Sequence, residues 1–240
     1  LFRYLFLILK SEIDNEIIRL AYDINNNFME NLVAFYLTNY ESCDADYICR
    51  TINSRSMWFA SKYKDGILMI ITNDEKDQIK NQINYILDLV QDICDDYVIG
   101  ISNYHNNIKY IKKAIIEATT SCEFSNILNN NIVNYAELEL YSILVPMKQG
   151  VELREFYNRK IIPIKEYDKD YNMNLFETAV CFIECDGNYE EVAKKMFLHE
   201  NTIRYRIVKI KQILNMENSN IEFFTQLSIA IKIHKLLYEI

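Results

Sequence analysis

Residues 188–214, NYEEVAKKMFLHENTIRYRIVKIKQIL, constrain the fold of this chain more than any other stretch. They predict two short helices joined by a tight turn at Phe197-Leu198-His199. Asn188 followed by Glu191 is typical of a helix start, because the asparagine side chain accepts from a free amide while the glutamate reaches back. An apolar stripe at helical spacing marks the inward face of the second helix: Ile203, Ile207, Ile210 and Leu214.

The opposite face of the second helix is polar and cationic. It carries Asn201, Arg204, Tyr205 and Val208. A helix that enters a major groove needs this division, since one face docks on its own domain and the other meets base edges. A charged amphipathic helix is more often a solvated surface, so the pattern alone leaves both interpretations open.

The chain as a whole is acidic rather than basic. Formal net charge is −8, so attraction to nucleic acid would have to come from a local patch. With 240 residues and 50% hydrophobic content the chain can bury more than one core, and 4 Gly and 2 Pro exclude linker-like or collagenous regions. The opening LFRYLFLILK is too short to span a bilayer and lacks a cleavage site. We interpret it as the tail of a helix from a longer chain.

Cysteines and histidines suggest no metal site, cofactor or nucleophile. The six cysteines, at 43, 49, 94, 122, 181 and 185, form no CxxC pair and have no histidine at metal spacing. We therefore expect a reduced, cytoplasmic protein with buried thiols. His105 lies in an Asn-rich turn and is expected to be solvated, His199 is expected to cap a helix or touch phosphate, and His234 to lie at the surface or be satisfied in the core.

The middle of the chain predicts an α+β domain. Residues 32–102 follow the order strand, helix, strand, strand, helix, strand, which is the ferredoxin-like βαββαβ pattern. Lys64-Asp65-Gly66 separates two β-rich runs and predicts a hairpin. A helix over 107–122 and an edge strand within 131–136 are predicted next.

From Ala136 onward the pattern is helical. Helices are predicted over 137–144 and 150–160, with the domain boundary placed in 161–174. A last, all-α unit begins at Asn174, which Glu177 follows as in a second capping box. Its remaining elements are a stop at Asp186-Gly187, the helix pair of 188–214, and a closing helix over 222–238.

Residues 164–238 resemble the C-terminal helix-turn-helix of the PucR/CdaR family of purine-catabolism and sugar-diacid regulators. The residues that carry the resemblance are Tyr167-Asp168, LFETAVCFIECDGN (175–188), Ala193, HENTIRYRIVKIKQIL (199–214) and Leu227 to Ala230. The run at 97–125 is similar to the segment that closes the family's degenerate GGDEF-like domain. The resemblance implies a helical linker from an upstream sensor (1–30), a GGDEF-like domain (31–145), a helical connector (146–173) and the helix-turn-helix domain (174–240).

The family implies a transcriptional regulator that binds operator DNA, usually as a homodimer, and that answers to a small-molecule effector through a sensor further upstream. Base-edge contacts are expected from Asn201, Arg204 and Tyr205. Phosphate contacts are expected from Thr202, Arg206 and Lys209, with Lys194, Lys195 and His199 beside them. Two positions depart from the pattern. Glu200 stands where arginine is common, and it either accepts from a cytosine amine or repels the duplex. Phe197 stands where many such turns have glycine.

The alternative is a nucleotide-binding or cyclase-like GGDEF domain with enzymatic activity. A diguanylate cyclase needs a Gly-Gly-Asp/Glu-Glu-Phe hairpin to hold its nucleotide and carboxylates after the first strand to hold Mg²⁺. Here the hairpin reads Lys62-Tyr63-Lys64-Asp65-Gly66 and the first strand ends in Leu37-Thr38-Asn39-Tyr40. We therefore expect no catalysis, while a nucleotide site or a dimer platform both remain open.

Overall fold

The computed structural model describes residues 31–39, 43–55, 58–73 and 76–238. The predicted helical linker over 1–30 lies outside the described residues. The chain divides between Glu139 and Leu140 into two compact units. We refer to the described residues up to Glu139 as the sheet unit and to those from Leu140 as the helical unit. A mixed α+β chain with a mostly helical carboxyl-terminal part is thus confirmed.

The sheet unit is built on five strands: β1 (Leu32–Thr38), β2 (Trp58–Tyr63), β3 (Gly66–Thr72), β4 (Val98–Ile101) and β5 (Ile132–Asn134). Their spatial order is β2-β3-β1-β4-β5. Strand β1 is antiparallel to both β3 and β4, and β5 joins the edge parallel to β4. Because β1 and β3 are buried on both faces, they read as continuous apolar runs rather than alternating ones.

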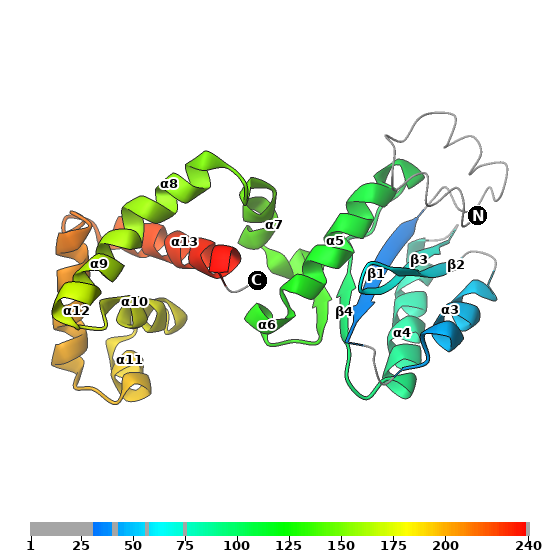
Figure 1. Ribbon diagram of the computed structural model, residues 1–240, viewed down its shortest axis with the longest axis horizontal. Coiled ribbons are helices and arrows are strands. Elements are labelled where there is room, and N and C mark those ends of the chain that lie inside the picture. The colour runs from blue at the N-terminus through cyan, green and yellow to red at the C-terminus, as the bar shows by residue number, and fades with distance from the viewer. Residues whose placement is uncertain (1–30, 40–42, 56–57, 74–75, 239–240) are drawn as a thin grey trace. The chain divides into compact units, whose positions relative to one another are not determined.

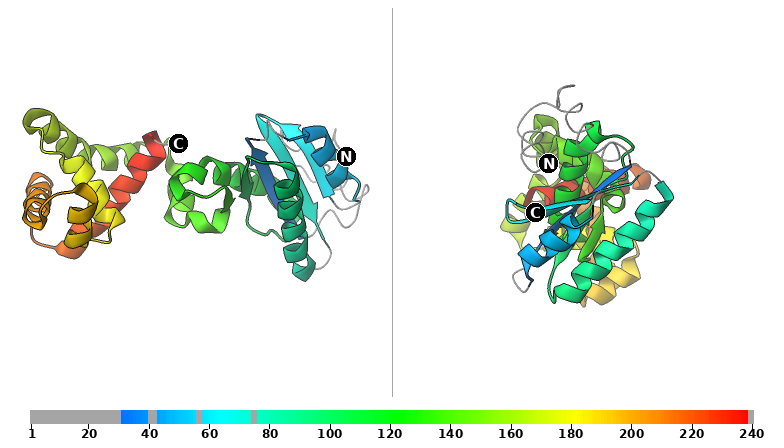
Figure 2. Two further views of the ribbon diagram at one scale, coloured as in Figure 1. Left: turned by 90° about the horizontal axis from the view of Figure 1, so that it is seen from below. Right: turned by 90° about the vertical axis from the view of Figure 1, so that its right-hand side faces the viewer.

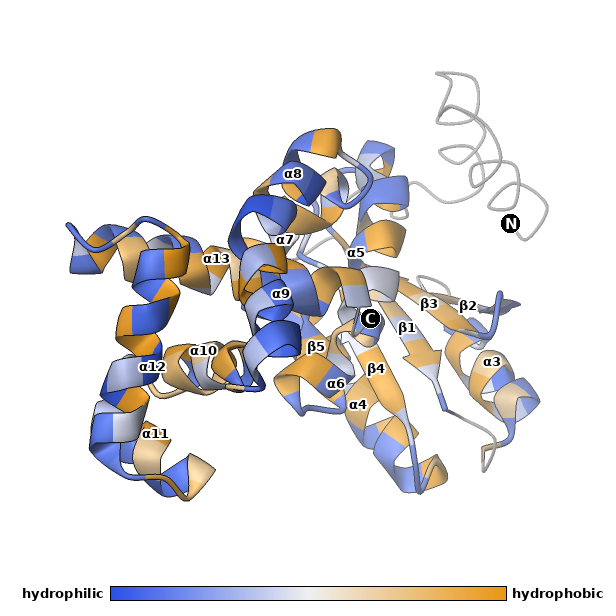
Figure 3. Ribbon diagram, turned by 60° about the vertical axis from the view of Figure 1, so that its left-hand side comes forward, coloured by the Kyte–Doolittle hydropathy of each residue, from blue (hydrophilic) through white to orange (hydrophobic). Residues whose placement is uncertain are grey.

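Helices cover both faces of this sheet (Figure 1). On one side lie α3 (Ala45–Asn53) and α4 (Lys76–Ile93), whose apolar residues Ile48, Ile52, Ile86 and Val90 join one core cluster. On the other lies α5 (Ile111–Glu123), preceded by η2 (Ile108–Tyr110), and its residues Ala114, Ile115 and Ala118 join a second cluster. The short elements α6 (Ser125–Leu128) and η3 (Tyr135–Leu138) flank β5. Figure 3 shows β3 and β4 as largely hydrophobic, as strands between two helical layers must be.

The predicted hairpin forms, but its glycine lies in the strand. Tyr63 pairs with Gly66, so the loop is Lys64-Asp65, and Lys64 adopts a left-handed backbone with φ 51°. A Cβ on Gly66 would lie 2.5 Å from the carbonyl oxygen of Leu37. Gly66 is therefore required by the close approach of β1, rather than by the turn conformation.

The helical unit contains only helices among its described residues (Figure 2). They are α7 (Leu140–Leu144), η4 (Val145–Met147), α8 (Val151–Lys160), α9 (Ile162–Tyr171), α10 (Leu175–Glu184), α11 (Tyr189–Met196), α12 (Glu200–Ile213) and α13 (Asn220–Tyr238). The stretch 161–174, in which the sequence places a domain boundary, contains α9, and α9 packs on α8 and α10 inside this unit. Across the described residues, no helix is both long and apolar enough to cross a bilayer.

The expected cap of α10 by Asn174 is wrong. Asn174 has φ 55° and leaves the helix start to Asp168 of α9. The Asp168 carboxylate accepts from the amides of Leu175 at 2.7 Å and Phe176 at 2.8 Å. The helix start is therefore supplied by a residue seven positions upstream, and a charged acceptor at a helix N-terminus is favourable.

The expectation of a solvated His105 is also wrong. Its backbone pairs with Leu32 at the start of β1, and its Nε2 lies 2.8 Å from Oε2 of Glu117 on α5. The side chains of His105 and Glu117 are only 9% and 2% exposed. The same carboxylate oxygen accepts from the amide of Asn103. The prediction rested on the polarity of the neighbouring residues. It failed because His105 is buried through its pairing with Glu117.

Expectations for the other histidines and the thiols had mixed outcomes. His234 is half-buried in the helical unit, where the Tyr157 hydroxyl lies 3.2 Å from its Nδ1, so it is satisfied as expected. Cys43 and Cys94 form a disulfide, which corrects the expectation that all six cysteines are reduced. The thiols of Cys122 and Cys185 are buried, and burial raises the pKa of Cys122 to about 12.

Candidate nucleic-acid interface

Helix α11 begins after Asn188 and ends at Phe197 as the sequence predicts, but the Asn188 amide donates to the carbonyl of Cys185 and not to Glu191, so only the asparagine half of the expected capping box forms. The Asn188 side chain accepts from the amides of Glu190 at 3.1 Å and Glu191 at 3.3 Å. At the other end, the amide of Leu198 donates to the carbonyl of Ala193 and that of Phe197 to Lys194, which is the pattern of a Schellman motif. These two ends fix the length of α11 and set the direction in which the chain enters α12.

Phe197 occupies the turn between the two helices under strain. Its φ is 55°, a left-handed conformation that L-residues adopt at a cost, and its side chain is 94% exposed. Glycine is the usual residue in this position of the motif. Apolar burial therefore does not explain the phenylalanine.

Helix α12 starts on a histidine cap. Nδ1 of His199 accepts from the amide of Asn201 at 3.1 Å, so the capping role expected of this residue is observed. Of the predicted stripe, Ile203, Ile207 and Ile210 are fully buried, whereas Leu214 follows the end of the helix and is half-buried. This burial fixes the rotation of α12 about its axis and thus decides which residues face outward.

The outward face of α12 consists of Asn201, Arg204, Tyr205 and Val208, all of which are exposed. It is the face predicted from the period of the sequence, and it presents an amide, a guanidinium, a phenol and one apolar side chain. These groups can donate to, accept from and pack against base edges. We refer to these four residues as the outward face.

Arg204 is held by groups from two helices. Its Nε and Nη2 donate to Oε1 of Glu200, at 2.9 and 2.5 Å, one turn earlier on α12. Its guanidinium carbon also lies 4.4 Å from the ring centroid of Tyr189, the first residue of α11. Glu200 therefore pairs with the arginine beside it, a role that the sequence interpretation did not consider. Tyr189 was missed, because a tyrosine after a cap residue carries no signal of its own.

Two of the residues expected to contact phosphate, Arg206 and Lys209, touch other helices of the unit. Arg206 donates through Nη1 to Oγ1 of Thr178 on α10 at 3.0 Å, and Nζ of Lys209 lies 5.1 Å from the ring of Tyr167 on α9. Thr202 is exposed. Arg206 therefore points toward α10 and Lys209 toward α9, whereas Arg204 lies against α11.

The two lysines of α11 are exposed and differ in their partners. Nζ of Lys194 lies 2.7 Å from Glu190, and this hydrogen bond raises the lysine pKa while it lowers that of the glutamate. The pKa of Lys195 is raised by a hydrogen bond with Cys185. Both ammonium groups are therefore charged near neutral pH.

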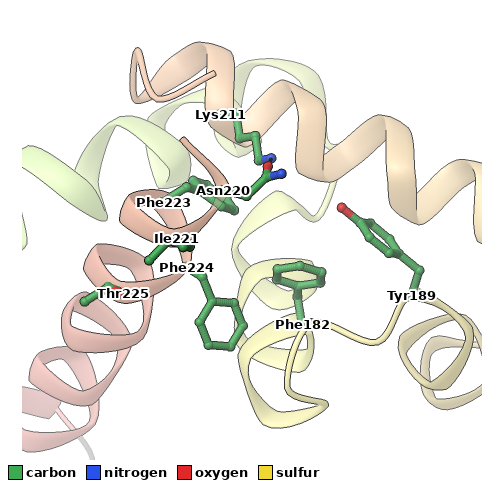
Figure 4. Close-up of a pocket in the computed structure, with 9 residues that line it drawn as sticks. Phe182, Tyr189, Lys211, Asn220, Ile221, Phe223, Phe224 and Thr225 are labelled. Atoms are coloured by element: carbon green, nitrogen blue, oxygen red, sulfur yellow. Dashed lines mark hydrogen bonds between the residues drawn. The ribbon is translucent and has the colours of Figure 1, made fainter. Parts of the chain in front are cut away.

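A pocket of about 410 Å³ lies behind the start of α11 (Figure 4). Aromatic side chains dominate its lining: Phe182, Tyr189, Phe223 and Phe224. Lys211 of α12 hydrogen-bonds Asn220 at its rim. The Phe182 ring lies 5.2 Å from that of Tyr189 and so supports the ring over which Arg204 stacks.

The sheet unit offers different chemistry at the hairpin where a cyclase would hold its nucleotide. Lys62 of β2 pairs with Asp46 of α3 at 2.9 Å, and this pair lowers the pKa of Asp46. Among the described residues, no group of three or more His, Cys, Asp or Glu side chains is placed to hold a metal ion.

Comparison with known proteins bears on the helical unit first. Residues 175–233 match the PucR C-terminal helix-turn-helix domain. The chain is 26% identical over 143 residues to the DNA-binding transcriptional activator AdeR of Bacillus subtilis, which covers 58% of this chain and 34% of AdeR. It is 27% identical over 148 residues to the proline-responsive transcriptional activator PutR of the same organism, which covers 60% of this chain and 36% of PutR.

A third relative is the purine catabolism regulatory protein of Bacillus subtilis, at 22% identity over 142 residues, 58% of this chain and 26% of that protein. The chain spans about a third or less of the length of these relatives. A crystal structure of a regulator of polyketide synthase expression from Bifidobacterium adolescentis matches with a TM-score of 0.48 and 15% identity, covering 97% of this chain and 91% of that one.

Proposed function

Since this chain carries a PucR-type helix-turn-helix domain over residues 175–233, we propose that it belongs to a cytoplasmic transcriptional regulator and binds operator DNA with α12. The observation that carries the proposal is the outward face of α12. Its buried stripe docks the helix on its own unit, and Asn201, Arg204 and Tyr205 are left exposed. A recognition helix uses this arrangement to place its amino-terminal residues against base edges in the major groove.

Contacts fall into two classes in this proposal. Asn201, Arg204 and Tyr205 read base edges, because amide and guanidinium groups match the donor and acceptor pattern of the major groove. Thr202, Arg206, Lys209, Lys194, Lys195 and His199 meet the phosphate backbone and set the register. Arg206 would have to exchange its bond with Thr178 for a phosphate, or act from where it is as a fixed positive charge.

A dimer is part of the proposal. One recognition helix buries little surface, and a net charge of −8 confines attraction to one face of the helical unit. Two copies that place α12 in successive major grooves would double the contacts and set half-sites about 34–36 Å apart. The dimer is a homodimer, as in the majority of soluble assemblies.

For the sheet unit we propose a degenerate GGDEF-like domain without catalysis. The unit ends at Glu139 and so lies within the range 31–145 that the sequence predicts for this domain. Its strand order and the hairpin at Lys62 to Gly66 support this assignment. It would relay the state of an upstream sensor that responds to a small molecule. The names of the relatives, which mention proline response and purine catabolism, support an effector of that size.

The test is selection of bound duplexes from a random DNA library with the purified chain. We expect a recurring half-site in two copies, and affinity that falls steeply with salt. Arg204→Ala should weaken binding to the selected duplex by about 1–3 kcal/mol. Arg154→Ala is the matched control, because Arg154 is an exposed arginine on α8. A library that yields no enriched sequence would overturn the proposal.

The rival function has a separate test. If the sheet unit were a cyclase, purified protein with Mg²⁺ and GTP would form a cyclic dinucleotide. We expect no turnover of GTP in this assay, and measurable product would contradict the assignment of a degenerate domain.

A further inference from the structure

We infer that Glu200 is a positioning residue, which holds Arg204 in the geometry that selects guanine at one position of each half-site. The inference rests on the proposed function, since it concerns how the same face reads DNA. It assigns Glu200 a third role, distinct from a direct contact with cytosine and from simple repulsion of the duplex.

An arginine side chain has five N–H donors in a planar fork. Glu200 takes the donor on Nε and one of the two on Nη2, which form one side of the fork. The remaining three, on Nη1 and Nη2, have no partner among the described residues. Together these two nitrogens form the end of the fork, and this end matches the O6 and N7 acceptors of guanine.

Tyr189 restrains the Arg204 guanidinium from one face of its plane. Its ring lies against one face of the guanidinium, with 4.4 Å between the carbon and the ring centroid. The ring is itself supported by Phe182 of α10, as Figure 4 shows for the two aromatic side chains. Arg204 is thus held by a carboxylate at its side and a ring on its face.

Such restraint matters because a free arginine has many rotamers to lose on binding. A side chain already held in its binding geometry loses less entropy and tolerates fewer alternative partners. The carboxylate also has an opposite effect, since it brings a negative charge close to the phosphates. Glu200 should therefore lower affinity for DNA in general while it sharpens the choice of base.

Glu190 provides the matched control. It forms an ion pair of the same i,i+4 spacing with Lys194 on α11 and is likewise an acid in the first turn of its helix. Glu190→Ala removes the same charge and the same kind of pair, but it frees a lysine expected to meet phosphate. The two variants therefore differ in which cation is released.

The experiment measures affinity of the full chain for the selected duplex and for single-base variants of it. In Glu200→Ala we expect the guanine preference at one position to fall about tenfold, while affinity for unrelated DNA rises. Glu190→Ala should raise affinity for unrelated DNA and keep every base preference. Glu200→Gln, which retains an acceptor for Arg204, should recover part of the lost preference.

A double variant separates positioning from direct contact. If Glu200 acts through Arg204, Glu200→Ala changes no base preference in an Arg204→Ala background. A preference that survives Arg204→Ala and then disappears with Glu200→Ala would assign the contact to the glutamate and overturn the inference. Unchanged base preferences in Glu200→Ala would also overturn the inference. The proposed function would still stand in that case, provided that the wild-type protein binds the selected duplex selectively. A wild-type protein without selectivity would overturn both.

Discussion

One polar pair in the sheet unit and one in the helical unit lie in opposite environments. In the sheet unit, His105 and Glu117 meet inside the core, where almost none of either side chain is exposed. In the helical unit, the side chains of Glu200 and Arg204 are 39% and 56% exposed. A buried pair that loses one member leaves a polar group unsatisfied, whereas an exposed pair contributes little to stability. The first pair therefore maintains a fold, and the second is available to a ligand.

The two units can be observed separately, because the single tryptophan lies in the sheet unit. Trp58 is buried on β2, so its fluorescence reports unfolding of the sheet unit. Far-UV circular dichroism follows the helices of both units, so a circular dichroism transition without a matching change in Trp58 fluorescence reports the helical unit. Both signals from one sample give the comparison an internal reference.

The largest expected effect breaks the buried pair. Glu117→Ala should lower the free energy of unfolding of the sheet unit by about 1–3 kcal/mol, because it leaves His105 and the Asn103 amide without their acceptor. The measurement is denaturant unfolding followed by Trp58 fluorescence. Glu123→Ala, an exposed acid on the same helix, should change it by no more than about 0.5 kcal/mol. Equal effects of the two variants would show that burial does not distinguish them.

A half-buried histidine provides the intermediate case. Burial, and after it Lys165 and Lys235, lower the pKa of His234 to about 4. The unfolded chain takes up a proton near its ordinary value of 6.5 and the folded unit does not, so the helical unit should lose stability as pH falls from about 6.5 to 4. Allowing for solvent screening, the loss is about 1–2 kcal/mol.

The check for His234 is thermal unfolding by circular dichroism at several pH values. His234→Gln should remove this part of the pH dependence, while the Trp58 transition should respond to pH as in the wild type. The same slope in both proteins would exclude His234 as its source.

The smallest expected effect concerns exposed strain. Phe197→Gly should raise the stability of the helical unit by about 0.5–1 kcal/mol, because glycine adopts φ 55° without the penalty of a Cβ. Phe197→Ala removes the ring but keeps the strain, so it should show no gain. Circular dichroism melts measure both, and a loss of stability with glycine would indicate that the ring makes a contact in solution.

Structural features that depend on residues close together in the sequence were predicted correctly. The strand over Leu32–Thr38, the Asn188 cap, the stop at Asp186-Gly187 and the outward face of α12 all follow from neighbours within a few residues. The helix-turn-helix and its resemblance to the PucR family rest on such signals and are confirmed for residues 175–233. The site residues themselves stay predictions, since DNA contacts await the experiments above.

Predictions failed where a residue interacts with a partner on another element, distant in the sequence. Asp168 replaced Asn174 as a cap because α9 brings its carboxylate to the start of α10. His105 was expected in solvent because its neighbours are polar, and Glu117 on the next helix decided otherwise. The Cys43–Cys94 disulfide joins residues 51 positions apart, a pairing that spacing alone cannot indicate.

The sequence by itself determined which face of α12 points outward, because the period of its buried isoleucines leaves only one face for Asn201, Arg204 and Tyr205. Only the tertiary structure decided how those groups are held. Tyr189 reaches Arg204 from the preceding helix, and Thr178 reaches Arg206 across 28 residues. The reason is physical: a helix's own hydrogen bonds set its period locally, whereas contacts between side chains of different helices exist only once the helices have packed.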